Sequence, residues 1–229
     1  MKNLFTTLLF LFAFVVSSQN YKITYSFSLN IDADTIKNAD RRHYYKNYFP
    51  EHAKNTLGVL WVNDKGTFFE QEGDLKNEYY KEKYIAEYYS SKSEKKVYYE
   101  IIKILEAPVN YRYTLFSDFK WQIAKESKII NGYTCFKAIG TLFNINGSKQ
   151  IFTAWFCPEI ALAYGPDTYA GLPGLIFEVY RNDGFGEHWK LKSIENNKTK
   201  IFNIPNPNDA EHYLVTFKRY ENLLKKFSK

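Results

Sequence analysis

The chain has 229 residues, of which 19% are aromatic and 24% charged, with only 7 prolines and 11 glycines. This composition excludes a disordered, collagen-like or low-complexity chain. The 31 lysines and arginines outnumber the 25 acidic residues, but they are interspersed with them, as in Lys81-Glu82-Lys83. Such mixing argues against nucleic acid as a partner.

Residues 1–18 have the features of an export signal. Lys2 precedes an uncharged apolar stretch over residues 4–16, and small residues follow it. The apolar stretch is too short to span a hydrocarbon core of about 30 Å. We therefore expect cleavage before Gln19, no integral membrane segment afterwards, and a periplasmic or outer-membrane-associated location.

The expected mature chain opens with a clear strand pattern. Residues 21–31 are apolar at every odd position and polar at every even position. This alternation predicts a half-buried antiparallel strand. Residues 39–55 carry tyrosines at helical spacing before Pro50, which predicts a short helix or a structured loop.

Eleven further segments are rich in the β-branched and aromatic residues that strands favour. They are 57–63, 66–71, 84–89, 96–105, 112–116, 119–124, 133–143, 149–157, 174–181, 187–195 and 199–203. No Pro/Gly/Ser-rich linker divides the chain. The sequence therefore predicts a single, mainly β domain over residues 19–229. Its expected core is a large curved antiparallel sheet, either a half-open barrel or a two-sheet sandwich.

The end of the chain changes to a helical period. Asn208 is a good N-cap, with Glu211 three residues later. Apolar residues then recur at steps of three and four, at Tyr213, Phe217, Tyr220, Leu224 and Phe227. This pattern predicts a C-terminal amphipathic helix that covers an open face or end of the sheet.

Two cysteines, Cys135 and Cys157, lie on the predicted arms of a hairpin. Export would place them in an oxidising compartment, where cysteine pairs usually bond. A two-residue turn at Asn146-Gly147 pairs residues whose numbers sum to 293, which sends the cysteines to opposite faces. A three-residue loop over 145–147 sets them directly across from each other. A disulfide between Cys135 and Cys157 is thus expected only with the longer loop.

The sequence contains no recognisable catalytic or cofactor motif. It has no nucleophile elbow, no glycine-rich phosphate loop, and no histidine pair at metal-ligand spacing. We therefore assign no catalytic residue, no metal and no cofactor. If the protein were a hydrolase, acid and base groups would have to converge near residues 165–174, and the candidates are Glu178, Asp167 and His188.

The densest motif is Gly165-Pro166 followed by Gly171-Leu172-Pro173-Gly174-Leu175-Ile176. Pro173 and Gly174 occupy the two central positions that a type II turn requires. This turn is either a tight reversal into a core strand or a loop that contacts a ligand through its bare backbone. The predicted binding residues are Trp155, Gly165, Pro166, Gly171, Leu172, Pro173 and Gly174.

The same hexapeptide resembles the signature of the GLPGLI family of exported envelope proteins of Gram-negative bacteria. Agreement extends in order from Trp121-Gln122-Ile123 through residues 128–138 and Ala154-Trp155-Phe156 to Ile176. Cys157 and Ala161 depart from the family pattern, so the resemblance does not imply the disulfide. It implies a β-rich fold and no established activity.

The features together predict a non-enzymatic binding or accessory module of the cell envelope. An apolar ligand, a peptide or an outer-membrane receptor would be its partner, because a concave aromatic sheet can hold an apolar group or a partner strand. The alternatives are an envelope hydrolase with acid and base residues near Gly171–Ile176, and a structural scaffold.

Overall fold

The computed structural model describes residues 20–54, 56–72, 86–91, 96–101, 111–115, 119–143, 149–182, 185–203 and 211–212. The expected signal peptide, residues 1–18, lies outside this range. So does most of the expected C-terminal helix, including its apolar stripe.

Strand β1 (Tyr21–Ile31) confirms the strand that the alternation of residues 21–31 predicts. Ile23 and Tyr25 are fully buried on it. A 3-10 turn (η1, Ala33–Thr35) follows, capped by the Asp32 side chain, and leads to helices α1 (Ala39–Asn47) and α2 (Phe49–Lys54). Among the described residues, no helix has the length and apolarity needed to cross a bilayer.

The strands form one sheet, in the order β12-β6-β5-β4-β3-β2-β1-β11-β10-β9-β8-β7. The sheet is therefore mainly antiparallel and single, and the two-sheet alternative is wrong. The remaining strand bounds are β2 Leu57–Val62, β3 Gly66–Glu72, β4 Ala86–Ser91, β5 Lys96–Ile101, β6 Tyr111–Leu115, β7 Lys120–Ile130, β8 Tyr133–Phe143, β9 Lys149–Cys157, β10 Leu175–Arg181, β11 Phe185–Asn196 and β12 Glu211–His212.

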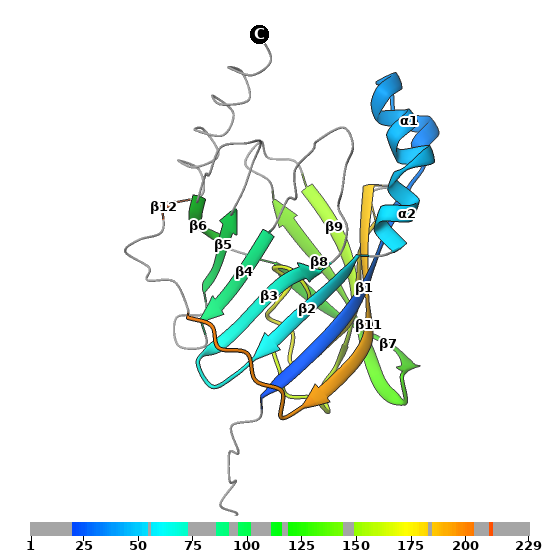
Figure 1. Ribbon diagram of the computed structural model, residues 1–229. Helices are drawn as coiled ribbons and strands as arrows, with labels where there is room; N and C mark the ends of the chain where they lie inside the picture. Colours follow the sequence, from blue (N-terminus) through cyan, green and yellow to red (C-terminus); the bar gives the residue numbers. More distant parts are fainter. Residues whose placement is uncertain are drawn as a thin grey trace, which may run out of the picture.

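The sheet consists of two meanders joined by one long pairing. Strands β1 to β6 follow one another outward in one direction, and β7 to β11 return from the far edge (Figure 1). The seam between them is the antiparallel pair β1–β11, which runs from Tyr21 opposite Asn196 to Ile31 opposite Phe185.

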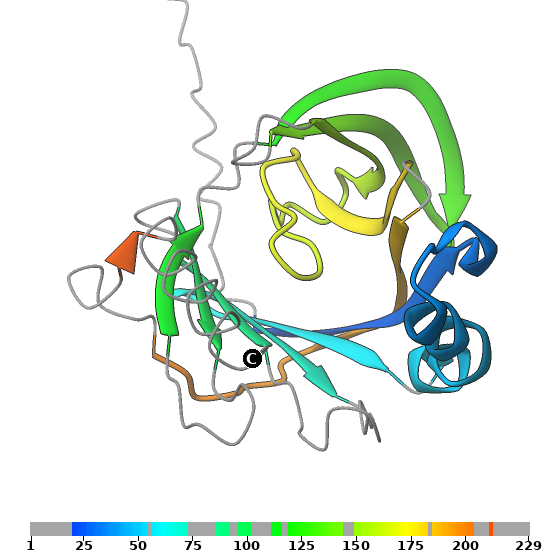
Figure 2. The same cartoon turned by 90° about the horizontal axis from the view of Figure 1, so that it is seen from above.

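Chain connectivity forces this sheet to curl. Strands β6 and β7 are consecutive in sequence but lie near opposite ends of the strand order. The five residue steps from Leu115 to Lys120 can span at most about 18 Å. The two ends of the order must therefore approach each other, although the described strands do not close the sheet by hydrogen bonds. Figure 2 shows the curl from above. Inside it lies the yellow loop between β9 and β10, residues 158–174, which we call the β9–β10 segment.

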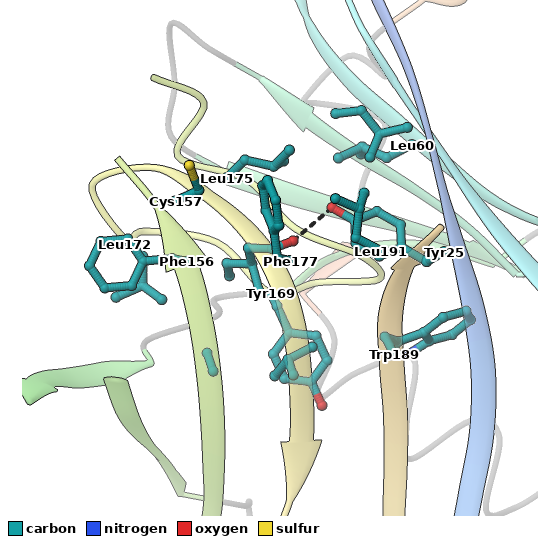
Figure 3. Packing of buried hydrophobic residues seen from close by; sticks show 14 of the residues in the cluster. Tyr25, Leu60, Phe156, Cys157, Tyr169, Leu172, Leu175, Phe177, Trp189 and Leu191 are labelled. Carbon is teal, nitrogen blue, oxygen red and sulfur yellow. Dashed lines mark hydrogen bonds between the residues drawn. The ribbon is translucent and has the colours of Figure 1, made fainter. Parts of the chain in front are cut away.

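The core lies where that segment packs against the seam strands (Figure 3). Leu172 and Tyr169 from the segment are 1% and 5% exposed, and they join Trp189, Phe177 and Leu60 in one buried cluster. The Tyr25 hydroxyl donates a hydrogen bond of 2.9 Å to the Ile176 carbonyl oxygen, which ties β1 to β10. Burial raises the pKa of Tyr25, because the phenolate would have to lose its hydration.

The structure differs from the sequence prediction most clearly at three places. Strand β7 extends to Ile130 instead of ending at 124, and a tight turn at Asn131-Gly132 joins it to β8. Both turn residues have positive φ, 50° and 84°, as a two-residue hairpin turn of the primed type requires.

The predicted strand 199–203 is not a strand. Its side chains instead fasten it to the sheet: the Lys200 ammonium binds the Glu70 carboxylate, and the Phe202 ring packs 5.6 Å from the Phe68 ring. The prediction that Glu211 lies in the first turn of a helix is also wrong, because Glu211 and His212 form strand β12, which pairs in parallel with β6.

Candidate functional site

The segment that carries the dense motif is largely packed. Of its predicted binding residues, four are buried (Gly165, Pro166, Leu172 and Gly174), while Gly171 and Pro173 are exposed. The Tyr164 carbonyl accepts a hydrogen bond of 2.9 Å from the Ile176 amide. The motif therefore anchors a loop to β10, and only its two exposed residues face solvent.

The turn itself differs from the type II turn that Pro173 and Gly174 predict. The Gly174 amide donates to the Leu172 carbonyl at 2.8 Å, while the Leu175 amide donates to Ile160 at 3.0 Å. Gly174 has φ 157°, and a Cβ at this position would lie 2.2 Å from the Cys157 carbonyl oxygen. Glycine is required here mainly because the backbone of β9 lies so close.

Trp121 holds the other side of the loop. Its indole nitrogen donates a 2.8 Å hydrogen bond to the Ala170 carbonyl. Its ring lies over Gly140, where an added Cβ would meet ring carbons at 2.5 Å. Gly171, with φ 93°, lies next to the same ring. Trp121, Gly140 and Gly171 thus form one packing unit that fixes the loop.

Trp155 belongs to a different group of side chains, which we call the Trp155 face. A row of cross-strand neighbours runs from Lys190 on β11 through Glu178 on β10 and Trp155 on β9 to Lys137 on β8. Directly opposed residues of antiparallel strands share a face of the sheet. Tyr180 and His188 form the adjacent row, with ring centroids 5.1 Å apart. The full set is Lys128, Lys137, Trp155, Glu178, Tyr180, His188 and Lys190.

Glu178 is the centre of the Trp155 face. It accepts hydrogen bonds from His188 Nε2 at 2.7 Å and from the Lys128 ammonium. Lys190 Nζ lies 3.7 Å from the same carboxylate. Lys128 also lies over the Trp155 ring, 4.3 Å from its centroid. An ionised carboxylate can only accept, so the His188 tautomer that satisfies this contact carries a proton on Nε2.

These contacts outweigh the burial of the carboxylate. The hydrogen bond from His188 lowers the pKa of Glu178 most, followed by the hydrogen bond and charge of Lys128, and burial opposes them. The resulting pKa is about 2. Glu178 is therefore ionised at every physiological pH, although its side chain is only 12% exposed.

The second perturbed carboxyl group is Glu187, and it lies on the other face. Burial raises its pKa, and the charge of Arg181 opposes that effect. Successive side chains of a strand alternate between faces, so Glu187 and Trp189 face away from His188 and Lys190. Glu178 and Glu187 have pKa values moved in opposite directions, but the sheet separates them.

The structure brings together two of the three hydrolase candidates. Glu178 and His188 are in contact, whereas Asp167 lies within the loop, with φ 54°. Sequence reasoning missed Lys128 and Lys190 as partners of Glu178. A two-residue turn at Asp183-Gly184 would set Glu178 opposite Trp189, whereas the observed register sets it opposite Lys190. Lys128 lies on β7, and strands β9 and β8 separate β7 from β10. Within the described residues, no group of three or more potential metal ligands occurs.

Cys135 and Cys157 are free thiols in this structure, and both are buried. The β8–β9 register pairs residues whose numbers sum to 292, from Phe136 opposite Phe156 to Phe143 opposite Lys149. This is the register of the longer loop, and the two-residue turn at Asn146-Gly147 is excluded by it. Burial, and then the neighbouring Cys157, raise the pKa of Cys135 to about 12.

The protein is thus a curled, open antiparallel sheet, and its Trp155 face is a surface of charged and aromatic side chains. A family model described as "Protein of unknown function (Porph_ging)" matches residues 142–178. The matched segment covers β9, the loop and β10 as far as Glu178. No curated protein matches the sequence.

Two solved structures are similar in fold. Both are of PNGF-II, one in space group C2 with a TM-score of 0.52 and one in space group P21 with a TM-score of 0.51. Each is 16% identical to this chain and covers 80% of it. The chain spans 29% of the length of PNGF-II. At this identity the likeness concerns the fold alone.

Proposed function

We propose that this protein is an exported, non-catalytic binding module of the cell envelope, and that its Trp155 face holds an acidic partner. The observation that carries the proposal is the Glu178 carboxylate, which Lys128, His188 and Lys190 surround. This arrangement fixes cations and rings in position while leaving the lysine heads partly in solvent.

Binding is favoured over proton transfer by the state of Glu178. A general acid or base works best when its pKa lies near the working pH. Glu178, with a pKa of about 2, neither donates nor accepts a proton readily near neutrality. Glu187, which has the opposite perturbation, faces the other side of the sheet and cannot complete an acid–base pair with it.

The charge of the Trp155 face indicates the chemistry of the partner. Lys128, Lys137 and Lys190 outnumber the acidic residues that they contact, Glu178 and Glu126. Lys190 is 58% exposed, and its distance to Glu178 is 3.7 Å, so its ammonium is free to turn toward a partner. An acidic protein segment would meet these cations and could rest on Trp155 and Tyr180, which are both half-buried.

An apolar ligand on the concave side is less well supported. The β9–β10 segment itself lies there, and its Leu172 and Tyr169 side chains are buried in the core cluster. The chain thus fills with its own side chains the place where such a ligand would bind. For this reason we favour a protein partner, such as an outer-membrane receptor, over a bound lipid.

The proposal that this protein is an accessory module has a second line of support. In PNGF-II this fold accounts for 29% of the chain, so there it is one part of a larger protein. The export features of residues 1–18 and the hexapeptide from Gly171 to Ile176 support an envelope location and kinship with the GLPGLI family. We propose a periplasmic or outer-membrane-associated module on this basis.

The test is co-purification from the native envelope with charge-reversal variants. We expect wild-type protein and the control Lys65→Glu, an exposed turn residue, to retain the same partner. Lys190→Glu should reduce the retained amount at least about tenfold, and 0.5 M salt should weaken the wild-type complex, because exposed charge pairs are screened. Equal retention by Lys190→Glu and wild type would refute binding through the Trp155 face.

A hydrolase remains the second candidate because Glu178 and His188 are 2.7 Å apart. In that case Glu178 would orient the imidazole, and His188 would act as the base. The matching experiment is a turnover screen with chromogenic esters and glycosides. Activity that disappears in both Glu178→Gln and His188→Ala, while both variants remain folded, would favour the enzyme. A scaffold role would leave both the partner test and the turnover screen negative.

A further inference from the structure

The two cysteines have the placement that a disulfide needs. One step beyond the pair of Phe136 and Phe156, the β8–β9 register sets Cys135 opposite Cys157. Directly opposed residues of an antiparallel pair have Cα atoms about 4.5–5.5 Å apart. Disulfides bridge Cα separations of about 4.4–6.8 Å. The register therefore places the two Cα atoms in the range that a disulfide bridges.

The thiols lie next to each other and are sealed from solvent. Cys157 is one of the neighbours that raise the pKa of Cys135, and both residues are 0% exposed. Leu175 pairs with Cys157 from β10, and Gly174 packs against the Cys157 carbonyl. The pair therefore lies at the point where the loop returns to the sheet.

We propose that Cys135 and Cys157 form a disulfide in the mature protein, and that this bond is made while the chain folds, before the two thiols are enclosed. The inference is independent of the Trp155 face and of any partner. It rests on the β8–β9 register and on the burial of both thiols.

The oxidant is a disulfide, either a small molecule or a disulfide-bearing oxidoreductase. One cysteine thiolate attacks a sulfur of the oxidant, which forms a mixed disulfide and releases one thiolate. The second cysteine then attacks the sulfur of the first, forms the Cys135–Cys157 bond and releases the second thiolate. Two electrons pass from the protein to the oxidant, and the two cysteine protons end on the released thiols.

Timing follows from the environment of the folded pair. Burial raises the pKa of Cys135 to about 12, so at pH 7.5 its thiolate fraction is below about one in ten thousand. With no exposed surface on either thiol, an oxidant cannot reach them without local opening. Reduced protein that has already folded should therefore oxidise slowly, whereas the folding chain should oxidise readily.

The bond would close a loop of 22 residue steps between Cys135 and Cys157. Constraining the unfolded chain in this way is expected to raise the Tm by roughly 6–12 °C for a domain of this size. It would also tie the start of β8 to the end of β9, beside Gly174.

The experiment uses the mature full-length chain, refolded from denaturant either with a reduced and oxidised glutathione mixture or with reductant alone. The oxidised sample should be 2 Da lighter by intact mass, should bind no alkylating reagent after denaturation, and should have the higher Tm. Folded reduced protein incubated with the same glutathione mixture should oxidise at least about 100-fold more slowly than the refolding chain.

The double variant Cys135→Ser/Cys157→Ser is the control, and its Tm should not depend on the glutathione mixture. Two free thiols, or glutathione adducts on both cysteines, in the protein refolded with glutathione would overturn the disulfide. Oxidation of the folded reduced protein at the rate of the refolding chain would overturn the timing. A failure of partner binding by the Trp155 face would leave each of these results unchanged.

Discussion

Replacing Glu178 by glutamine tests the electrostatics of the Trp155 face directly. The substitution keeps the size of the side chain and removes its charge, so Lys128 and His188 lose their anionic partner. A tenfold difference in proton affinity corresponds to ~1.4 kcal/mol. The fall in the pKa of Glu178 from 4.5 to about 2 therefore corresponds to roughly 3 kcal/mol of folding free energy.

The sign of the pH dependence follows from the direction of that change. The folded-state pKa is below the unfolded value, so the stabilisation is fully present above about pH 4.5. It is lost as the pH falls toward 2, where the folded carboxylate also takes up a proton. Glu178→Gln should therefore lower the free energy of unfolding by roughly 2–3 kcal/mol at pH 7, and the difference from wild type should shrink below pH 4.5.

The assay is urea unfolding followed by tryptophan fluorescence at several pH values between 7 and 3. Glu126→Gln is the matched control, since Glu126 pairs with Lys137 at 2.8 Å but is 62% exposed. An exposed pair contributes at most about 1 kcal/mol. The reasoning is refuted if Glu178→Gln is no less stable than Glu126→Gln at pH 7. It is also refuted if the destabilisation by Glu178→Gln is as large at pH 3 as at pH 7.

Two further predictions concern the core. Gly174→Ala places a Cβ 2.2 Å from the Cys157 carbonyl oxygen and should lower the Tm by at least about 8 °C. In the control Gly132→Ala the new Cβ meets nothing within 4 Å at a φ of 84°, so the Tm should fall by less than half as much. Equal losses of Tm in the two variants would contradict the close-packing argument. Tyr25→Phe removes the buried hydrogen bond to the Ile176 carbonyl. In urea titrations it should lower the free energy of unfolding by about 1–2 kcal/mol. An unchanged free energy of unfolding would mean that the Tyr25 hydroxyl does not make this hydrogen bond.

The strand pattern could be predicted from the sequence where one face of a strand is buried and the other is wet. Residues 21–31 are the best case, because burial at Ile23 and Tyr25 requires the alternation that the sequence displays. The limits of β7 were harder to predict. The polar residues Lys125, Glu126 and Ser127 interrupt the apolar alternation of Trp121 and Ile123, and the pairing with β8 shifts between Ile123 and Ser127. The Asn131-Gly132 turn was the stronger signal.

The centre of the Trp155 face could be predicted only in part. Glu178 is conspicuous as an acid among apolar strand residues. The position of His188 depends on a register one residue away from the one that a two-residue turn at Asp183-Gly184 predicts. Lys128 is 50 residues away in sequence, and its contact with Glu178 depends on the strand order and on the long reach of its side chain. The segment 199–203 shows the same limit, because its contacts to the sheet, Lys200 with Glu70 and Phe202 with Phe68, join residues far apart in sequence.

The β1–β11 seam has a consequence for how the polypeptide is made. Strand β1 is the first element of the described chain, yet one of its two neighbours begins only at Phe185. During synthesis the first meander can assemble early, but β1 keeps an open hydrogen-bonding edge until nearly the whole chain is available. Contacts of such long sequence separation slow folding, and open edges invite pairing with other chains. Chaperone protection of the nascent N-terminal half should therefore matter more than protection of the second half.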